Sequence, residues 1–379
     1  MTNNPIPENM RGAFERSEHP YHMWESLVST PEALELVLAS RESRIFENVA
    51  RALSVRSMVH FIGCGTSFFN AQASAYAYQM LTGRPAVAHD AFEFVAYPPP
   101  DIALSAVVGV SHSGKTAATV DGVRLARAQG AVTIGYTDYE GTPLAQEANF
   151  TIYSPNPEKQ GPKTRSYASS LLRSYLLSAA LLEDVGEESE ELTALLERAP
   201  QLTQQVLDEH RQEMEQLAER FADHERIVII GGGPQVATAG ETALKLIETA
   251  LINADSWEIE EAVHGTWVCL EEGDLVVIIG TEGPSLEKAQ TLVKGFKEIG
   301  VTLWGVTDVS GALDGADHET VLPVEVPEWY APLFTMLPFY QFIYYYTLAS
   351  TDLHPDRAPY VDPRYREARR IIRESTKTV

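Results

Sequence analysis

The sequence reads Ala-Gln-Gly-Ala-Val-Thr-Ile-Gly-Tyr-Thr-Asp at residues 128–138 and Glu-Ile-Gly-Val-Thr-Leu-Trp-Gly-Val-Thr-Asp at residues 298–308, an offset of 170 residues. Matching apolar segments precede both copies at nearly the same offset. Phe61-Ile62-Gly63 corresponds to Ile229-Ile230-Gly231, and the run 106–110 corresponds to 275–280. The repeat indicates a duplicated fold, in which each half is a series of strands and helices.

Apolar runs of strand length alternate with helical patterns in each half, for example at 117–129 and 285–299. This alternation is typical of parallel sheets that helices cover on both faces. We therefore predict an α/β protein made of two tandem three-layer α/β/α sandwiches. Residues 22–53 carry Leu and Val at helical spacing, which predicts an N-terminal helical arm in addition.

The two halves are separated by residues 184–225, which are rich in Glu, Gln, Leu and Arg and nearly free of Gly. Such a composition predicts one or two surface helices. The expected domains are a helical arm at 1–50, a first α/β domain at 51–190, connecting helices at 191–225, a second α/β domain at 226–350 and a tail at 351–379.

Charge and cysteine content narrow the function classes. The chain has 29 Lys and Arg against 53 Asp and Glu, a net charge of −24, which repels nucleic acids and anionic membranes. An anionic substrate must therefore be held by local dipoles. Only two cysteines occur in the 379 residues, and the start of the sequence has no secretory signal pattern, so we expect a cytoplasmic protein.

The segment Ala331 to Ser350 is nearly all apolar and is the one candidate for a membrane span. Pro332, Pro338 and Gln341 interrupt it, and no second span accompanies it. We interpret it as a helix buried inside the protein.

Two loops in the first half have the composition of a phosphate site. Residues 61–67 read Phe-Ile-Gly-Cys-Gly-Thr-Ser, and residues 107–116 read Val-Val-Gly-Val-Ser-His-Ser-Gly-Lys-Thr. Each apolar strand ends in glycines and hydroxyls, where the backbone can approach an anion and a helix start offers free N–H groups. Either loop alone is compatible with ordinary helix capping, but the two together favour a sugar-phosphate site.

These loops resemble those of the double sugar isomerase (SIS) domain family, which includes the isomerase half of glucosamine-6-phosphate synthase. The resemblance spans roughly residues 20–379 and extends through Glu241, Lys245, Glu248 and His264 at matching spacing. It implies flavodoxin-like SIS domains, and it implies that the phosphate is bound by the two loops. The residues so assigned are Gly65, Thr66, Ser67, Ser111, His112, Ser113 and Thr116.

Several positions depart from the family pattern. Lys115 stands where the synthase commonly has a glutamate, and either adds charge to the site or points to solvent. His112 replaces a residue that is often glutamine, and can hydrogen-bond a substrate hydroxyl. Thr266 stands where proline is usual, and Trp257 replaces a smaller aromatic, so the substrate of the synthase is not assumed.

Chemistry is expected in the second half, where the spacing puts Glu241, Lys245 and Glu248 on one helix face. The resemblance implies that Glu248 moves a proton between C1 and C2 of the sugar, which calls for a carboxylate buried in an apolar cleft. Glu241 and Lys245 can alternatively form only a surface ion pair. The resemblance also implies that His264 assists ring opening, and that Lys377 is the lysine that forms a Schiff base, although a terminal lysine can equally be solvated.

Three functions remain open at this stage. The first is an isomerase or deaminase of aminosugar or ketose 6-phosphates without glutaminase activity. The second is a fructosamine-6-phosphate deglycase, and the third is a regulator that senses sugar phosphates without turnover. We expect no metal and no cofactor, and the resemblance implies a homodimer with pockets at the subunit interface.

Overall fold

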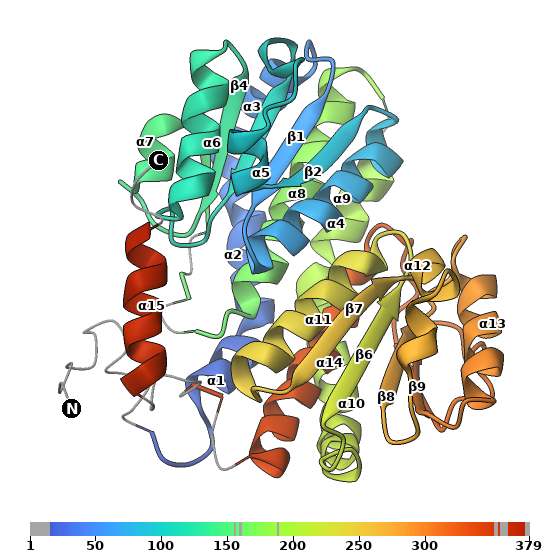
Figure 1. The fold of residues 1–379 in the computed structure, drawn as a ribbon. Coiled ribbons are helices and arrows are strands. Elements are labelled where there is room, and N and C mark those ends of the chain that lie inside the picture. Colours follow the sequence, from blue (N-terminus) through green and yellow to red (C-terminus); the bar gives the residue numbers. More distant parts are fainter. Residues whose placement is uncertain are drawn as a thin grey trace. The chain divides into compact units, whose positions relative to one another are not determined.

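The computed structural model describes residues 16–154, 157–158, 161–187, 189–351, 355–356 and 363–375. The chain divides into two compact units, which are described one at a time. The first unit contains residues 29–159, 163–201 and 370–379, and the second contains residues 1–28, 160–162 and 202–369. Figure 1 labels the helices and strands of both.

The first unit is built on a five-stranded sheet in which every neighbouring pair is parallel, in the order β2-β1-β3-β4-β5. Its strands are β1 (Val59–Gly63), β2 (Ala86–Asp90), β3 (Ala106–Val110), β4 (Val132–Thr137) and β5 (Phe150–Tyr153). Strands β1 and β3 are buried along their whole length, as expected for the centre of a sheet that is covered on both faces.

Helices cover both faces of this sheet. One face packs α5, α6 and α7 over a core that includes Ile62, Phe94 and Val107, while α3, α4 and α8 pack together elsewhere in the unit. The helices of the unit are α2 (Thr30–Ala39), η3 (Ser40–Ser43), α3 (Ile45–Leu53), α4 (Thr66–Thr82), α5 (Ala91–Ala96), η4 (Ile102–Leu104), α6 (Ala117–Ala128), α7 (Pro143–Glu147), α8 (Arg165–Asp184) and α9 (Glu190–Glu197).

The second unit repeats the same topology, because its parallel sheet has the order β10-β9-β8-β6-β7. Its strands are β6 (Arg226–Gly231), β7 (Asn253–Glu258), β8 (Leu275–Ile279), β9 (Thr302–Thr307) and β10 (His318–Val321). Its helices are α1 (His22–Val28), α10 (Ala199–Arg220, which begins in the first unit), α11 (Gln235–Thr249), α12 (Ile259–Val263), η5 (Thr266–Cys269), α13 (Leu286–Lys297) and α14 (Ala331–Ser350). Two tandem α/β/α sandwiches, as predicted, are confirmed.

The apolar segment Ala331–Ser350 forms helix α14, which is buried from Ala331 to Thr347 and packs on α11 and α1. Among the described residues, no helix has both the length and the hydropathy needed to cross a membrane. The buried-helix interpretation is thus confirmed.

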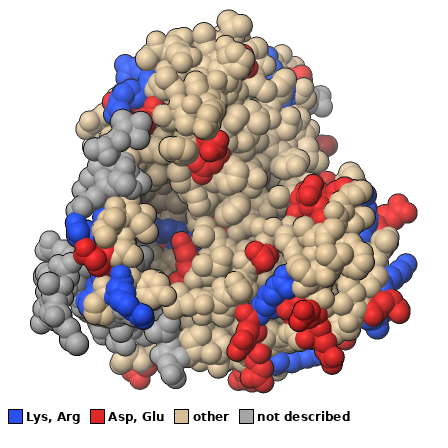
Figure 2. Space-filling model, viewed as in Figure 1, with Lys and Arg blue, Asp and Glu red and all other residues tan. Residues whose placement is uncertain are grey.

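The helices expected at the N-terminus are present, but they do not form one arm. Helix α1 packs on α14 of the second unit, whereas α2 and α3 pack on α8 of the first. At the other end, α15 (Pro363–Ser375) covers part of the tail. Acidic side chains are dispersed over the face shown in Figure 2, in keeping with the net charge of −24.

Candidate functional site

In each sheet, successive strands are first added on one side and then on the other, so the strand order reverses at one point. In the first sheet β1 is followed by β2 on one side and then by β3 on the other, so the reversal lies between β1 and β3. Open α/β sheets leave a crevice for ligands at this point, outside the carboxyl ends of the two strands. The two loops predicted to bind phosphate, residues 64–67 and 111–116, leave the sheet there.

The loop after β1 is held close to the start of α4. A Cβ placed on Gly63 would overlap the backbone carbonyl of Ser67, so only glycine allows this approach. Gly65 has a positive φ of 57° and precedes Thr66, the first residue of α4. Ser67 is buried within this turn. The loop therefore brings helix N–H groups and a hydroxyl to the edge of the sheet.

The loop after β3 is tied to the end of β4. The carbonyl of His112 accepts a hydrogen bond from the Asp138 N–H at 2.9 Å, and the Ser111 hydroxyl donates to Thr116 Oγ1 at 3.0 Å. Thr116 is the N-cap of α6. Ser113 and Lys115 are exposed, so Lys115 takes the solvent-facing position of the two that were open.

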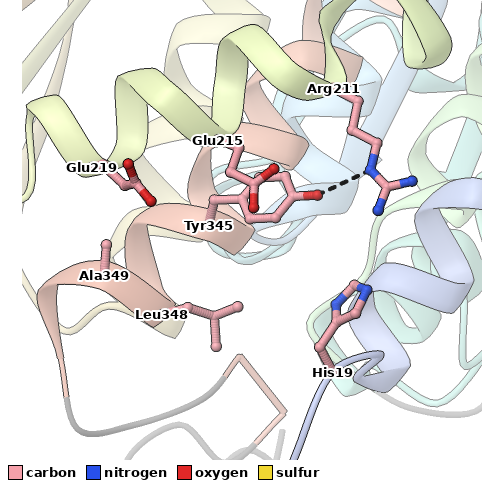
Figure 3. A pocket seen from close by; sticks show the side chains of 7 residues that line it. All are labelled: His19, Arg211, Glu215, Glu219, Tyr345, Leu348 and Ala349. Carbon is pink, nitrogen blue, oxygen red and sulfur yellow. Dashed lines mark hydrogen bonds between the residues drawn. The ribbon is translucent and has the colours of Figure 1, made fainter.

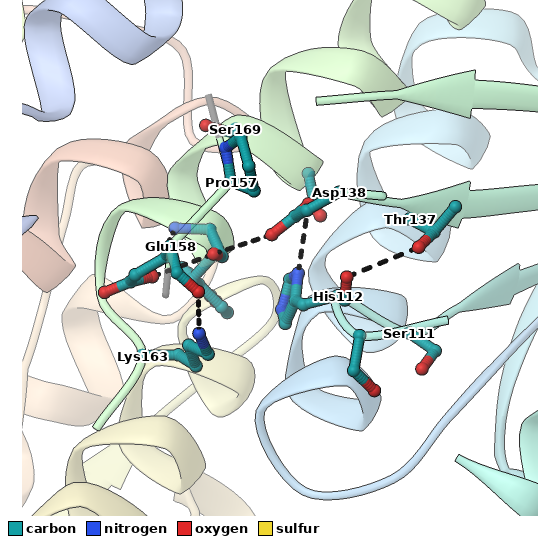
Figure 4. A network of polar contacts seen from close by, with 12 residues as sticks. Ser111, His112, Thr137, Asp138, Pro157, Glu158, Lys163 and Ser169 are labelled. Carbon is teal, nitrogen blue, oxygen red and sulfur yellow. Dashed lines mark hydrogen bonds and ion pairs between the residues drawn. The ribbon is translucent and has the colours of Figure 1, made fainter. Parts of the chain in front are cut away.

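A buried polar network lies beneath this loop (Figure 4). His112 is only 7% exposed, and its Nδ1 lies 3.9 Å from Oδ1 of Asp138. The same Oδ1 lies 3.5 Å from the fully buried guanidinium of Arg173, and Ser166 Oγ lies 3.0 Å from Oδ2 of Asp138. Ser166 Oγ also lies 2.8 Å from Oε2 of the buried Glu158.

The second sheet reverses between β6 and β8, and carboxylates lie against its loop after β8. Residues 280–285 correspond to 111–116, and Ser285 is the N-cap of α13 as Thr116 is of α6. The Glu328 carboxylate lies directly against Gly283, and Asp308 Oδ1 accepts the Glu282 N–H at 2.7 Å. Burial raises the pKa of Asp308; it also raises that of Glu328, with a further contribution from the Asp308 charge. Two carboxylates at this position disfavour the binding of a phosphate. The two halves therefore share a fold, but the loop of the second half is not suited to an anion.

The carboxylates on α11 form one chain of contacts. Lys245 Nζ lies 2.6 Å from Oε2 of Glu248 and 3.5 Å from Oε1 of Glu241, which also accepts the Tyr340 hydroxyl at 3.0 Å. Although burial disfavours the ammonium, Glu241 and Glu248 raise the pKa of Lys245. Both Glu241 and Lys245 are fully buried, so the surface ion pair considered from the sequence is wrong.

Glu248 is the last residue in this series of contacts and lies at the surface of the second unit. Its side chain is 45% exposed, in contrast to the buried carboxylate expected from the sequence. It lies in the last turn of α11 next to the exposed Ile247, on the face of the helix that is not buried. A carboxylate that is both reachable and fixed in direction by a buried ammonium is suited to exchange a proton with a bound molecule.

His264 lies far from Glu248 within one chain. It directly follows α12, is 70% exposed, and its Nε2 lies 3.0 Å from Oε1 of Glu260, which also pairs with Lys288. Strand β7 runs from the end of α11 to the start of α12, and its six residues span about 20 Å. The last turn of α11, which carries Glu248, thus precedes the first residue of β7, and His264 follows α12 beyond its last residue.

A cavity and the grouping of possible metal ligands also bear on the candidate site. A cavity of about 420 Å³ lies between α10 and α14 (Figure 3), and its lining residues include none predicted from the sequence. It is lined by His19, Arg211, Glu215, Glu219, Tyr345, Leu348 and Ala349. Within the described part of the chain, no three His, Cys, Asp or Glu side chains are grouped to hold a metal ion. Lys377 lies outside the described residues.

Comparison with known proteins agrees with this geometry. The sequence model of the SIS domain family matches residues 52–182 and again residues 220–344. The two matches together cover more than half of the chain and both parallel sheets. The chain belongs to the SIS domain family. Its two SIS domains carry the two reversal points described above.

Curated relatives of this SIS protein include two enzymes named glutamine–fructose-6-phosphate aminotransferase (isomerizing). The one from Thermococcus kodakarensis is 27% identical over 90% of this chain and 57% of its own length. The one from Pyrobaculum aerophilum is 26% identical over 89% of this chain and 56% of its own length. The chain thus spans little more than half the length of these relatives.

Solved structures of SIS proteins share the fold. The C-terminal domain of glucosamine-fructose-6-phosphate aminotransferase from Francisella tularensis superposes with a TM-score of 0.81 at 19% identity, covering 89% of this chain and 99% of that one. A structure titled glucosamine-6-phosphate deaminase from Thermotoga maritima gives a TM-score of 0.68 at 21% identity, covering 89% and 97%.

Proposed function

We propose that this SIS protein converts phosphosugars, as an isomerase or deaminase of aminosugar or ketose 6-phosphates without glutaminase activity. The observation that carries the proposal is the Glu248 carboxylate, reachable from solvent and held at 2.6 Å by the buried Lys245. A regulator that only binds its ligand has no need for a base fixed in this way. The names of the relatives, an isomerizing aminotransferase and a deaminase, support the same class of chemistry.

In the proposed reaction Glu248 removes a proton from one of the two carbons C1 and C2 and returns it to the other. The intermediate is an enediol, which forms as the carbonyl oxygen takes up a proton and collapses as the other hydroxyl gives one up. When the substrate carries nitrogen it is an enolamine, and one water then hydrolyses the resulting imine and releases ammonia. Lys245 fixes the direction of the carboxylate, and Glu241 with Tyr340 holds Lys245 from behind. The reaction needs a positioned base and polar donors, which the chain itself supplies.

The phosphate is assigned to the first SIS domain, and a matched pair of variants tests this. We expect one fructose 6-phosphate per chain, and about tenfold weaker binding in Thr116→Ala, because a hydrogen bond to a charged oxygen is lost. Ser285→Ala makes the equivalent change in the second domain, beside Asp308 and Glu328, and should leave affinity unchanged. Isothermal titration calorimetry gives both numbers. Two phosphates per chain, or a larger loss in Ser285→Ala, would contradict the assignment.

We further propose a homodimer in which His264 serves the pocket of the neighbouring chain. The support is strand β7, which is about 20 Å long and lies between the end of α11 that carries Glu248 and the start of α12 that precedes His264. Each variant His264→Ala and Glu248→Gln should then be nearly inactive alone. Co-refolding the two should restore up to about a quarter of wild-type activity, because half of the dimers are hybrids with one intact pocket. No recovery in a mixture shown to contain hybrid dimers would contradict this arrangement.

A panel of ketose and aminosugar 6-phosphates tests the proposed function, first by thermal shift and then by product analysis. Isomerised sugar or released ammonia is the expected result. A fructosamine-6-phosphate deglycase is the second candidate, because the exposed Trp267 and Val268 beside His264 offer an apolar surface for a larger amine. It would release an amino acid in place of ammonia. Tight binding with no conversion of any compound would overturn the proposed function in favour of a sensor.

A further inference from the structure

His112 is a buried side chain whose ring nitrogens have no hydrogen-bond partner. It is 7% exposed, and neither Nδ1 nor Nε2 makes a hydrogen bond to the described residues. Nδ1 faces Asp138 at 3.9 Å, which is within ion-pair distance and beyond hydrogen-bond distance. Buried polar atoms are nearly always satisfied, so an unsatisfied imidazole in a ligand-binding loop points to a partner that arrives with the ligand.

Asp138 is held in place from three sides. Arg173 lies 3.5 Å from its Oδ1, Ser166 lies 3.0 Å from its Oδ2, and its own N–H is bonded to the carbonyl of His112. Arg173 in turn donates to the carbonyl of Ile152 at 2.8 Å. Although burial disfavours the ionised form, His112, Arg173 and Ser166 hold the pKa of Asp138 below its usual value. The carboxylate next to His112 is therefore charged and rigid.

Most charged groups of the described network around His112 already have partners. Arg173 and Asp138 neutralise each other, the Lys115 side chain is exposed, and Lys163 donates to the carbonyl of Glu158, whose carboxylate adds negative charge. Tyr136, beneath Arg173, stays neutral because burial raises its pKa to about 12. A positive group would stabilise a dianion in this loop beyond what the helix N–H groups supply, and His112 is a titratable side chain of the loop that can become one.

We propose that His112 takes up a proton from solvent when a sugar phosphate binds, with Asp138 as the positioning residue that directs it. Nδ1–H then faces the Asp138 carboxylate and Nε2–H donates to a phosphate oxygen. One proton moves from solvent to the imidazole, and no covalent bond to the substrate forms. The inference rests on the assignment of the phosphate to the first SIS domain, and it makes sugar-phosphate affinity fall as pH rises.

Calorimetry of fructose 6-phosphate binding at pH 7.5, in buffers of different ionisation enthalpy, counts the protons taken up. The ester is mostly a dianion at this pH, since the second pKa of a phosphate ester is near 6, so uptake reports on the protein. Wild type should take up a large fraction of one proton per site. His112→Gln should take up none and bind about tenfold more weakly, because a charge-assisted hydrogen bond is lost. Asp138→Asn should lower both quantities.

Glu140→Gln is the matched control, because it removes one negative charge two residues from Asp138 at an exposed position. It should change neither proton uptake nor affinity. If Asp138→Asn does not fold, Ser166→Ala replaces it, since it removes one contact of Asp138. Binding by wild type without proton uptake, or unchanged uptake in His112→Gln, overturns the proposal while the phosphate site stands. Failure of wild type to bind any sugar phosphate overturns the proposed function as well.

Discussion

Replacing Glu248 by glutamine is expected to lower kcat by about a thousandfold, within the range that general bases contribute. Glutamine has the same shape and can still contact Lys245, but it cannot accept a proton from carbon. The phosphate is assigned to the other SIS domain, so affinity for the sugar phosphate should change by less than about threefold. Turnover is measured on the first active compound of the sugar panel, and affinity by calorimetry.

The matched control for this variant is Glu298→Gln. Glu298 is an exposed carboxylate at the end of α13 in the same SIS domain, and it should leave kcat and affinity unchanged. If Glu248→Gln retains more than about a tenth of the wild-type kcat, Glu248 is not the base. If kcat and affinity fall together, Glu248 holds the substrate and does not act only on its protons.

The fold was predictable because the sequence contains an internal repeat. Two Thr-Asp strand ends, at Asp138 and Asp308, follow equal series of apolar runs, and a repeated pattern must serve the same architecture twice. The central strands β1, β3 and β8 are buried along their whole length, so they are continuous apolar runs that are easy to recognise. The packing of the N-terminal helices was not predictable, since the amphipathic spacing of α1 and α2 does not say which partner each one meets.

The two loops were predicted as a phosphate site because glycines and hydroxyls after a buried strand are a local signal, and the structure places both loops at the reversal point of the first sheet. Thr116 and Ser285 are both N-caps, but their loops differ in sequence and in packing. The second loop contains Glu282, and Glu328, more than forty positions away in the sequence, lies against its Gly283. The local sequence therefore indicates part of the acidic character of the second loop, and tertiary packing supplies the rest.

Asp138 and Arg173 were missed as site residues. Asp138 was visible only as part of the repeat, and its counterpart Asp308 has no arginine partner among its described contacts. Arg173 lies in the interior of α8 among Ser, Leu and Tyr, eight residues after Arg165 at the start of the helix, and a cation inside such a segment is a usable signal of a buried charge pair. The same signal applies to Lys245, a lone cation among small and apolar residues of α11.

Replacing Lys245 by methionine is expected to lower the free energy of unfolding by about 3–5 kcal/mol, the cost of removing one partner of a buried ion pair. The fully buried carboxylate of Glu241 then loses its ammonium and retains the Tyr340 hydroxyl. Urea unfolding at pH 7 measures the loss. Lys294→Met, at an exposed position on α13, is the control and should change stability by less than about 0.5 kcal/mol.

The double variant Glu241→Gln/Lys245→Met separates the electrostatic cause from a loss of packing. With the buried carboxylate neutralised, we expect at least half of the lost stability to return, because the penalty comes from a charge and not from a missing side chain. Without the Lys245 ammonium, the Glu248 carboxylate should no longer be held in one direction. We therefore expect kcat of the double variant to lie below the wild-type value even when its stability has recovered. If the double variant is no more stable than Lys245→Met, the contribution of Lys245 is packing alone, and the chain of contacts on α11 does not stabilise the fold by its charge.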